Sequence, residues 1–219
     1  MADRLLQQGH RVTTPTQTGL GARRHLASNA LTLAMYVEDI VNHMMCEDMK
    51  EVILVGHSFG GLAISGVAER LPSRIRQLVY LDALILQAGQ TPYGVLPEEV
   101  VSQRRTSCTS YNGVRAFPPP PVSVFGIPED HPEAEWVRSN LTPQPESLYD
   151  TPLPITKAVG NGLPCTYIAC TSPVLGSVAS SQAWARQQGH WHWRELATGH
   201  DAMVTDPDGL THLLIEIGE

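Results

Sequence analysis

The sequence predicts an α/β protein with a mostly parallel sheet and flanking helices, and two observations lead to this prediction. Short runs of apolar and strand-favouring residues, at 52–56, 75–83 and 165–171, alternate with segments whose apolar residues recur at helical spacing. Strands that are separated by helices pair in parallel, because the helix carries the chain back to the end of the sheet where the previous strand began. The length of 219 residues suits one such domain with a substantial core.

The remaining elements follow the same alternation. Helices are expected over 1–9, 31–48, 62–71, 180–188 and from 206 to the C-terminus. Strands are expected over 10–14, 51–56, 75–83, 165–171 and 190–196. Gly9 is placed to end the first helix, and Asp206-Pro207 supplies an N-cap and a first-turn proline for the last one.

The composition indicates a globular protein and argues against a nucleic-acid-binding or membrane-spanning one. A hydrophobic content of 42% and a charged content of 17% are typical of globular proteins. The net charge of −7, without clustered Lys and Arg, argues against a nucleic-acid partner, and no apolar run approaches membrane-spanning length. The four cysteines form no C-x-x-C pair, which indicates reduced thiols and a cytoplasmic location. His190 and His192 have metal-ligand spacing but no apparent third ligand, so we expect no metal and no cofactor.

A proline-rich stretch, residues 84–157, interrupts the alternation. Two short helical patches, at 98–105 and 133–140, lie within it, and its aromatic and apolar residues require burial. We expect an inserted cap over the C-terminal edge of the sheet, where α/β folds bind ligands. The chain then divides into a first core part (1–83), the cap (84–157) and a second core part (158–219).

The motif Gly56-His57-Ser58-Phe59-Gly60 stands between a predicted strand and a predicted helix. This is G-x-S-x-G in the setting of a nucleophile elbow, although a glycine-rich structural turn is the alternative. A serine hydroxyl becomes a nucleophile when it is held exposed, beside a base and near backbone N–H donors. We expect Gly56 and Gly60 to permit the sharp turn, and the N–H of Phe59 to face a developing oxyanion.

Together with the late Gly199-His200-Asp201, the elbow and the inserted segment resemble the α/β-hydrolase superfamily. The closest similarity is to its small-esterase branch, which includes plant methyl-ester esterases, hydroxynitrile lyases and bacterial relatives. The segments that carry the resemblance are 18–26, 52–61, 78–83, 151–154 and 198–207. The resemblance implies an α/β-hydrolase fold, with Ser58 as the nucleophile and His200 as the general base.

The acidic partner of the histidine departs from the pattern of the family. Its members usually carry an Asp just after the strand that ends here at Thr171, but this sequence continues Thr171-Ser172-Pro173. Asp82 ends the preceding strand of the sheet, at an alternative position that the superfamily also uses. Asp82 is therefore either the residue that orients His200 or the cap of a helix or loop. Asp201 is expected to cap the turn that follows it.

The N-terminus also departs from the pattern of the family, and the resemblance implies an N-terminally truncated fold. Relatives begin with two or three strands and an H-G-x-W type loop that supplies a second oxyanion N–H, whereas this chain starts in the helix after that loop. About 20–30 residues are then missing, including a strand between 10–14 and 52–55. Either the start of the gene is misassigned, or the product was trimmed, or the strands rearrange. If residues 1–219 are the whole product, we expect direct pairing of residues 10–14 with Val52–Val55 to close the gap in a monomer, with strand exchange in a homodimer as the alternative.

These observations predict a carboxylic-ester hydrolase that acts on a small apolar ester through an acyl-enzyme, with Ser58, His200 and Asp82 in the catalytic roles. One alternative is a catalytically impaired chain, a fragment or binding module, since the oxyanion loop is missing. Another is a hydroxynitrile-lyase-like activity. That activity is disfavoured because those lyases carry a Lys directly after the catalytic His, where this chain has Asp201.

Overall fold

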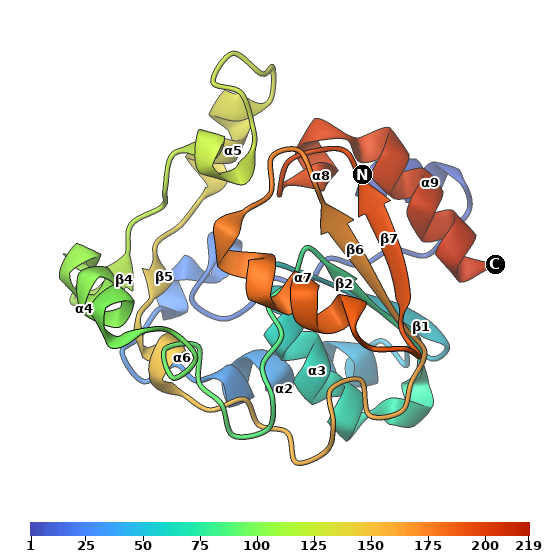
Figure 1. Cartoon of the computed structure of the whole chain (residues 1–219), viewed down its shortest axis with the longest axis horizontal. Helices are drawn as coiled ribbons and strands as arrows, with labels where there is room; N and C mark the ends of the chain where they lie inside the picture. The colour runs from blue at the N-terminus through green and yellow to red at the C-terminus, as the bar shows by residue number, and fades with distance from the viewer.

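A parallel four-stranded sheet lies at the centre of the computed structural model, which describes all residues from 1 to 219 (Figure 1). Its strands are β1 (Val52–His57), β2 (Ile75–Leu81), β6 (Cys165–Cys170) and β7 (His192–Leu196), paired in that order. The predicted α/β class and the parallel pairing are therefore confirmed.

Helices cover both faces of this sheet. Because successive side chains of a strand point to opposite faces, Leu78 and Tyr80 pack in one apolar cluster, and Val79 and Leu81 pack in another. The first face is covered by α2 (Leu33–Cys46), α3 (Gly60–Arg70) and α7 (Ala179–Arg186). The second face is covered by α1 (Ala2–Gln7), α8 (Ala202–Thr205) and α9 (Pro207–Gly218). No helix combines the length and the apolar character that are needed to cross a membrane.

The helix ends agree with the expected capping residues. Asp206 caps α9 by accepting a hydrogen bond from the N–H of Gly209 at 2.9 Å. Gly9 adopts a left-handed conformation, with φ of +86°, just beyond α1. Short 3₁₀ turns complete the chain: η1 (Gly21–Leu26), η2 (Pro72–Arg74), η3 (Val122–Phe125) and η4 (Gly176–Val178).

The inserted segment, residues 84–157, contains the two helices that were expected and a small sheet that was not. The expected helices are α4 (Glu98–Ser107) and α5 (Ala134–Asn140), and a single helical turn, α6 (Ser147–Asp150), was not expected. The antiparallel sheet consists of β3 (Thr109–Tyr111), β4 (Val114–Phe117) and β5 (Gln144–Pro145). These strands are too short to give a recognisable alternation in the sequence, which is why the analysis of periodicity missed them.

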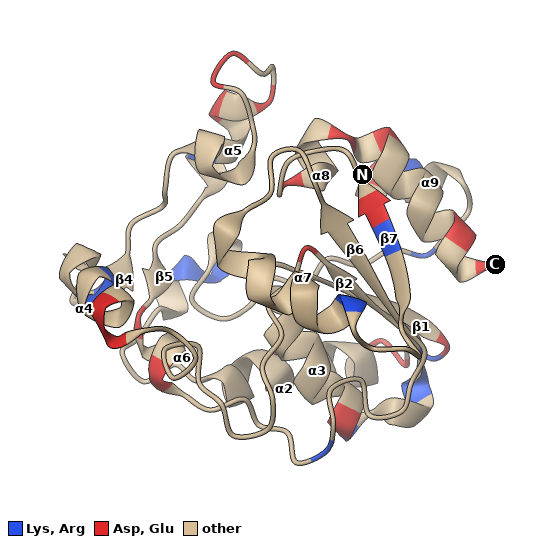
Figure 2. Ribbon diagram, viewed as in Figure 1, with Lys and Arg blue, Asp and Glu red and all other residues tan.

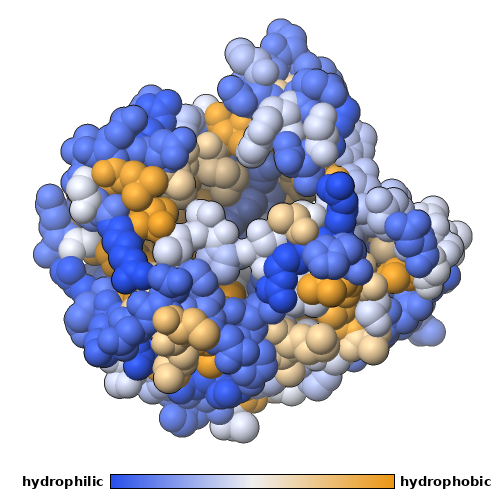
Figure 3. Space-filling view, turned by 180° about the vertical axis from the view of Figure 1, so that it is seen from behind, coloured by the Kyte–Doolittle hydropathy of each residue, from blue (hydrophilic) through white to orange (hydrophobic).

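The expected strand at residues 10–14 does not form, so the predicted direct pairing with β1 is wrong. Side-chain contacts hold this segment on α2 instead. Arg11 donates to the carboxylate of Glu47 at 2.7 Å, and Thr13 is hydrogen-bonded to His43 at 3.0 Å. A cavity of about 1620 Å³ separates the segment from β1, and both line it. The face shown in Figure 3 is hollowed, and apolar residues border the hollow.

As a result, β1 is an edge strand with one free row of backbone groups. The N–H of Ser58 donates to the carbonyl of Leu81 in β2 at 3.1 Å. Because backbone groups alternate between the two edges of a strand, those of Ile53, Val55 and His57 face away from β2, where β1 has no other strand partner. The four residues from Val52 to Val55 are only partly buried, although the sheet they begin is the core of the fold.

One buried carboxylate, that of Glu146, joins several parts of the inserted segment through hydrogen bonds. Glu146 is 4% exposed and accepts hydrogen bonds from Arg115, from Arg105 at 3.3 Å and from the hydroxyl of Tyr93 at 3.1 Å. Arg105 also donates to Asp150 at 2.7 Å, which joins α4 to α6. Figure 2 shows that charged residues lie mainly on the outer helices and loops, whereas the Glu146 carboxylate is buried.

We expect Glu146→Gln to lower the free energy of unfolding by about 1–3 kcal/mol, because it removes a buried charge that three donors share. Glu135→Gln is the matched control. Glu135 pairs with Arg138 at the surface, where its side chain is 78% exposed, and its loss should cost less than about 0.5 kcal/mol. Urea unfolding of both variants measures the difference, and equal effects would contradict this role of Glu146.

Candidate active site

The G-x-S-x-G motif forms a sharp turn between β1 and α3. Ser58 adopts a φ of +53°, in the left-handed region that non-glycine residues seldom occupy. Its carbonyl accepts hydrogen bonds from the N–H of Gly61 at 3.1 Å and from that of Leu84 at 2.9 Å. These bonds hold the turn against the loop that follows β2, so the serine is presented by a fixed backbone.

Two glycines make this turn possible, but they are not the two that were expected. A Cβ on Gly56 would lie 2.8 Å from the carbonyl oxygen of Gly60, and a Cβ on Gly61 would lie 2.5 Å from that of Leu84. Gly60 itself has open space around the position of a Cβ. The expectation is thus confirmed for Gly56 and wrong for Gly60, and Gly61 has the steric role instead.

Phe59 lies between the serine and the first residue of α3. Its backbone N–H has no hydrogen-bond partner within the protein. An N–H group at a helix N-terminus favours negative charge nearby, as the sequence analysis expected for this residue. The Phe59 ring packs on Tyr149 of the inserted segment, with 5.2 Å between the ring centres.

Asp82 follows β2 directly and is completely buried. Its φ is +41°, and its N–H donates to the carbonyl of Ile168 in β6 at 2.7 Å. One carboxylate oxygen, Oδ2, lies 2.6 Å from Nδ1 of His200. The other, Oδ1, accepts from the N–H of Cys170 at 3.2 Å and from the side-chain amide of Gln182 at 2.6 Å. The buried carboxylate therefore has three donors.

His200 follows β7 and is 1% exposed. Because its Nδ1–H donates to Asp82, the neutral ring carries no proton on Nε2, which is the atom that can accept one. Nε2 is buried and has no hydrogen-bond partner in the protein. The inserted segment contacts the loop that carries His200, because the carbonyl of Phe125 accepts a hydrogen bond from the N–H of Asp201 at 3.1 Å. A Cβ on Gly199 would lie 2.7 Å from the Cα of Gly126, so these two glycines allow the close contact.

His57 supports the His200 loop rather than the serine. Its Nε2 donates to the backbone carbonyl of His200 at 3.0 Å, and the two ring centres are 4.4 Å apart. Burial lowers the pKa of His57 to about 3, so its ring stays neutral. His57 therefore lines the base of the elbow and is not a second base for Ser58.

Asp201 does not have the capping role that was expected. Its side chain makes no cap hydrogen bond to α8, and its Oδ1 lies 3.6 Å from Nε2 of His57, beyond hydrogen-bond distance. Burial raises the pKa of Asp201 to about 6, with the neighbouring His200 acting in the opposite direction.

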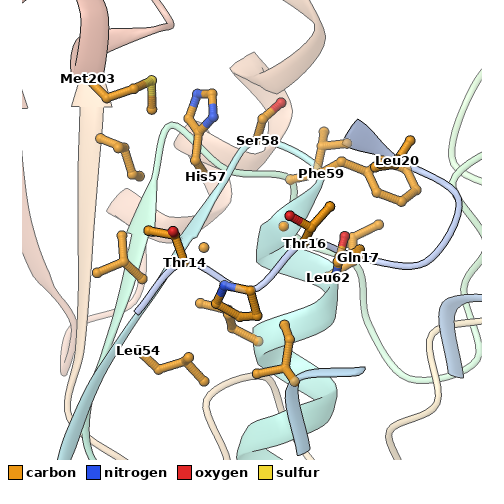
Figure 4. Close-up of a pocket in the computed structure, with 18 of the residues that line it drawn as sticks. Thr14, Thr16, Gln17, Leu20, Leu54, His57, Ser58, Phe59, Leu62 and Met203 are labelled. Carbon is orange, nitrogen blue, oxygen red and sulfur yellow. The ribbon is translucent and has the colours of Figure 1, made fainter. Parts of the chain in front are cut away.

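The cavity begins at the serine. Figure 4 shows Ser58 and His57 side by side at one end of it, with the Ser58 hydroxyl turned away from the His57 ring. Thr14, Thr16 and Gln17 of the N-terminal segment lie across from β1 in the same view. The hydroxyl of Ser58 makes no hydrogen bond to His200 Nε2 in this structure.

One group of side chains has the geometry to meet around a metal ion. The possible ligand atoms of His57, His200 and Asp201 lie within 4.8 Å of one another. Both rings already use a nitrogen for a hydrogen bond, His57 to a carbonyl and His200 to Asp82. The expectation that the site needs no metal and no cofactor stays a prediction.

The structure thus brings together the residues that the sequence analysis selected. Asp82 and His200 are in contact, and Ser58 and Phe59 form the turn beside them. Sequence reasoning missed Gln182, which reaches Asp82 from α7. Nothing in the local sequence marks this glutamine, because only the packing of α7 beside the end of β2 reveals its contact.

The model of the alpha/beta hydrolase family matches residues 2–212. The chain belongs to this family. An esterase of Nocardioides sp. (strain SG-4G), named a carbendazim-hydrolysing esterase, is 31% identical over 223 residues, which cover 98% of this chain and 90% of the relative. Methyl jasmonate esterase 1 of Vitis vinifera is 31% identical over 130 residues, 58% of this chain and 49% of that protein. The resemblance found in the sequence is confirmed, and the protein is a hydrolase of the esterase type.

Solved structures show the same fold. An extracellular α/β-hydrolase from a Paenibacillus species superimposes with a TM-score of 0.75 at 23% identity, over 98% of this chain and 90% of that one. A polyneuridine aldehyde esterase variant gives a TM-score of 0.77 at 18% identity, over 100% and 92% of the two chains. This hydrolase therefore has the α/β-hydrolase fold that was predicted.

The raised pKa of Asp201 gives this hydrolase a predictable pH dependence of stability. The folded state retains the proton up to about pH 6, whereas the unfolded chain releases it near the ordinary Asp pKa of 3.8. Stability is therefore lost as the pH rises through this window. We expect Asp201→Asn to stabilise the protein at pH 7.5 by up to about 3 kcal/mol and to have little effect near pH 4. Denaturant unfolding at both pH values measures this, and a stabilisation that is independent of pH would contradict it.

Proposed function

We propose that the protein is a carboxylic-ester hydrolase in which Ser58, His200 and Asp82 form the catalytic triad. The observation that carries the proposal is the buried pair of Asp82 and His200, 2.6 Å apart, which leaves the basic Nε2 of His200 without a partner. The strained, partly exposed turn at Ser58 supports the role of nucleophile.

In the proposed reaction, Ser58 Oγ attacks the ester carbonyl carbon while His200 Nε2 takes the hydroxyl proton. The oxyanion accepts a hydrogen bond from the free N–H of Phe59. Asp82 stabilises the imidazolium, which then donates its proton to the leaving alcohol as the C–O bond breaks. Water, activated by His200, releases the acid from the acyl-enzyme and restores Ser58. The serine side chain must first rotate toward His200, since the two are not hydrogen-bonded in the structure.

The cavity supports a small apolar substrate. Close to Ser58 it is lined by Phe59, Leu84, Phe117 and Tyr149, which offer apolar and aromatic surface. The names of the relatives, a methyl jasmonate esterase and several putative methylesterases of Arabidopsis thaliana, support methyl esters as the class to try first.

The inserted segment is proposed as a cap on this site, and 1–83 and 158–219 as the two parts of the core. Phe125 packs with its ring centre 6.0 Å from that of His200, which supports this division. The four cysteines are unpaired in the structure, which is compatible with the predicted cytoplasmic location. That location stays a prediction, as does the choice between monomer and homodimer.

We expect Ser58→Ala to abolish the release of p-nitrophenol from a short acyl ester, because the Ser58 hydroxyl is the proposed nucleophile that forms the acyl-enzyme. Ser139→Ala is the matched control and should keep full activity, because this exposed serine does not line the cavity and its hydroxyl donates to Glu135. Turnover that survives in Ser58→Ala would contradict the proposal. An inactive parent protein would favour the catalytically impaired alternative.

We expect Asp82→Asn to lower kcat by about 10⁴-fold, because an Asn amide would favour the wrong tautomer of His200. The fold should persist, since the two side chains have the same shape. Steady-state kinetics together with circular dichroism of the variant check both points. Unchanged activity would turn attention to Ser172 or a water molecule as the partner of His200.

A further inference from the structure

The side chain of Gln182 reaches the proposed catalytic acid from a different element of the fold. Gln182 lies in the first turns of α7, and its Nε2 donates to Oδ1 of Asp82 at 2.6 Å. The N–H of Cys170 donates to the same oxygen at 3.2 Å. The opposite oxygen, Oδ2, is left for Nδ1 of His200.

We propose that Gln182 is a positioning residue, which fixes the carboxylate of Asp82 so that Oδ2 stays directed at His200. This inference rests on the proposed function, because it assigns a role in the same triad. A carboxylate that is completely buried requires donors on both oxygens, and an amide donor to an ionised group gives a strong, directional bond. Without Gln182, Oδ1 keeps only the longer bond from Cys170, and the carboxylate is free to turn.

The attachment of α7 does not depend on this bond. The hydroxyl of the preceding residue, Ser181, accepts from the N–H of Ile85 at 2.9 Å, and Ala185 is buried in the main apolar cluster. The helix is therefore fixed to the loop after β2 by other contacts. A substitution at Gln182 should remove the orienting bond while α7 stays in place.

The variant Gln182→Met tests this role, because methionine has a similar length and no N–H group. We expect kcat on a p-nitrophenyl ester to fall about 10- to 100-fold, with KM changed by less than about twofold. Gln182→Glu places a second carboxylate next to Oδ1 of Asp82, and its kcat should fall at least as far. This variant replaces Gln182→Met in the test if the Met variant does not fold. Gln188→Met is the matched control and should keep full activity, because the side chain of Gln188 donates only to the carbonyl of Trp184, at 3.0 Å.

A double-mutant cycle separates positioning from a general effect on the fold. If Gln182 acts through Asp82, Gln182→Met should add no further loss of kcat in the Asp82→Asn background. Equal losses in both backgrounds overturn the inference, as does full activity of Gln182→Met beside a large loss in Asp82→Asn. Full activity of Asp82→Asn would instead overturn the proposed triad itself, so the two failures are distinguishable.

Discussion

The parallel pairing of β1 with β2 is the interaction on which the site depends. The register sets His57 opposite Leu81, so the residues that follow, Ser58 and Asp82, leave the sheet side by side. Both then adopt positive φ angles, +53° and +41°, which turn their side chains out of the strand direction at once. Non-glycine residues in this region are strained, and the hydrogen bonds around both turns hold them there. Two strained residues at adjacent strand ends thus locate the candidate site.

Around this pair, the site is assembled from elements that are distant in the sequence. The His200 loop follows β7. His57 donates to the backbone carbonyl of His200, and the carbonyl of Phe125 in the inserted segment accepts from the N–H of Asp201. Gln182 arrives from α7. The carboxylate of Asp82 is buried and needs hydrogen-bond donors. It receives them from the ring of His200, the backbone N–H of Cys170 and the side-chain amide of Gln182, and not from a Lys or Arg side chain. A network of neutral donors orients a carboxylate without adding a second formal charge to the interior.

The sequence allowed the sheet class and the main residues of the site to be predicted because local patterns encode them. The elbow motif identified Ser58, and the end of a buried strand identified Asp82. Gln182 could not be predicted, because its contact joins residues 100 positions apart and depends on where α7 docks. The strand expected at residues 10–14 failed for a related reason. Its β-branched residues favour an extended chain, but a strand also needs a ladder partner, and side-chain bonds hold this segment on α2 instead.

The edge of β1 that has no strand partner ends next to the proposed nucleophile. Edge strands in natural proteins usually carry a Lys, a Pro or a bulge that prevents pairing with another molecule. β1, with the sequence VILVGH, has no Lys or Pro, and its pairing with β2 is irregular only between Val52 and Ile53. Its open backbone groups end at His57, one residue before the proposed nucleophile. Residues 10–17 lie across the cavity from this edge without hydrogen-bonding to it. The unpaired backbone edge of β1 and the proposed nucleophile are therefore neighbours in the chain, and a strand that paired with this edge would end beside the elbow.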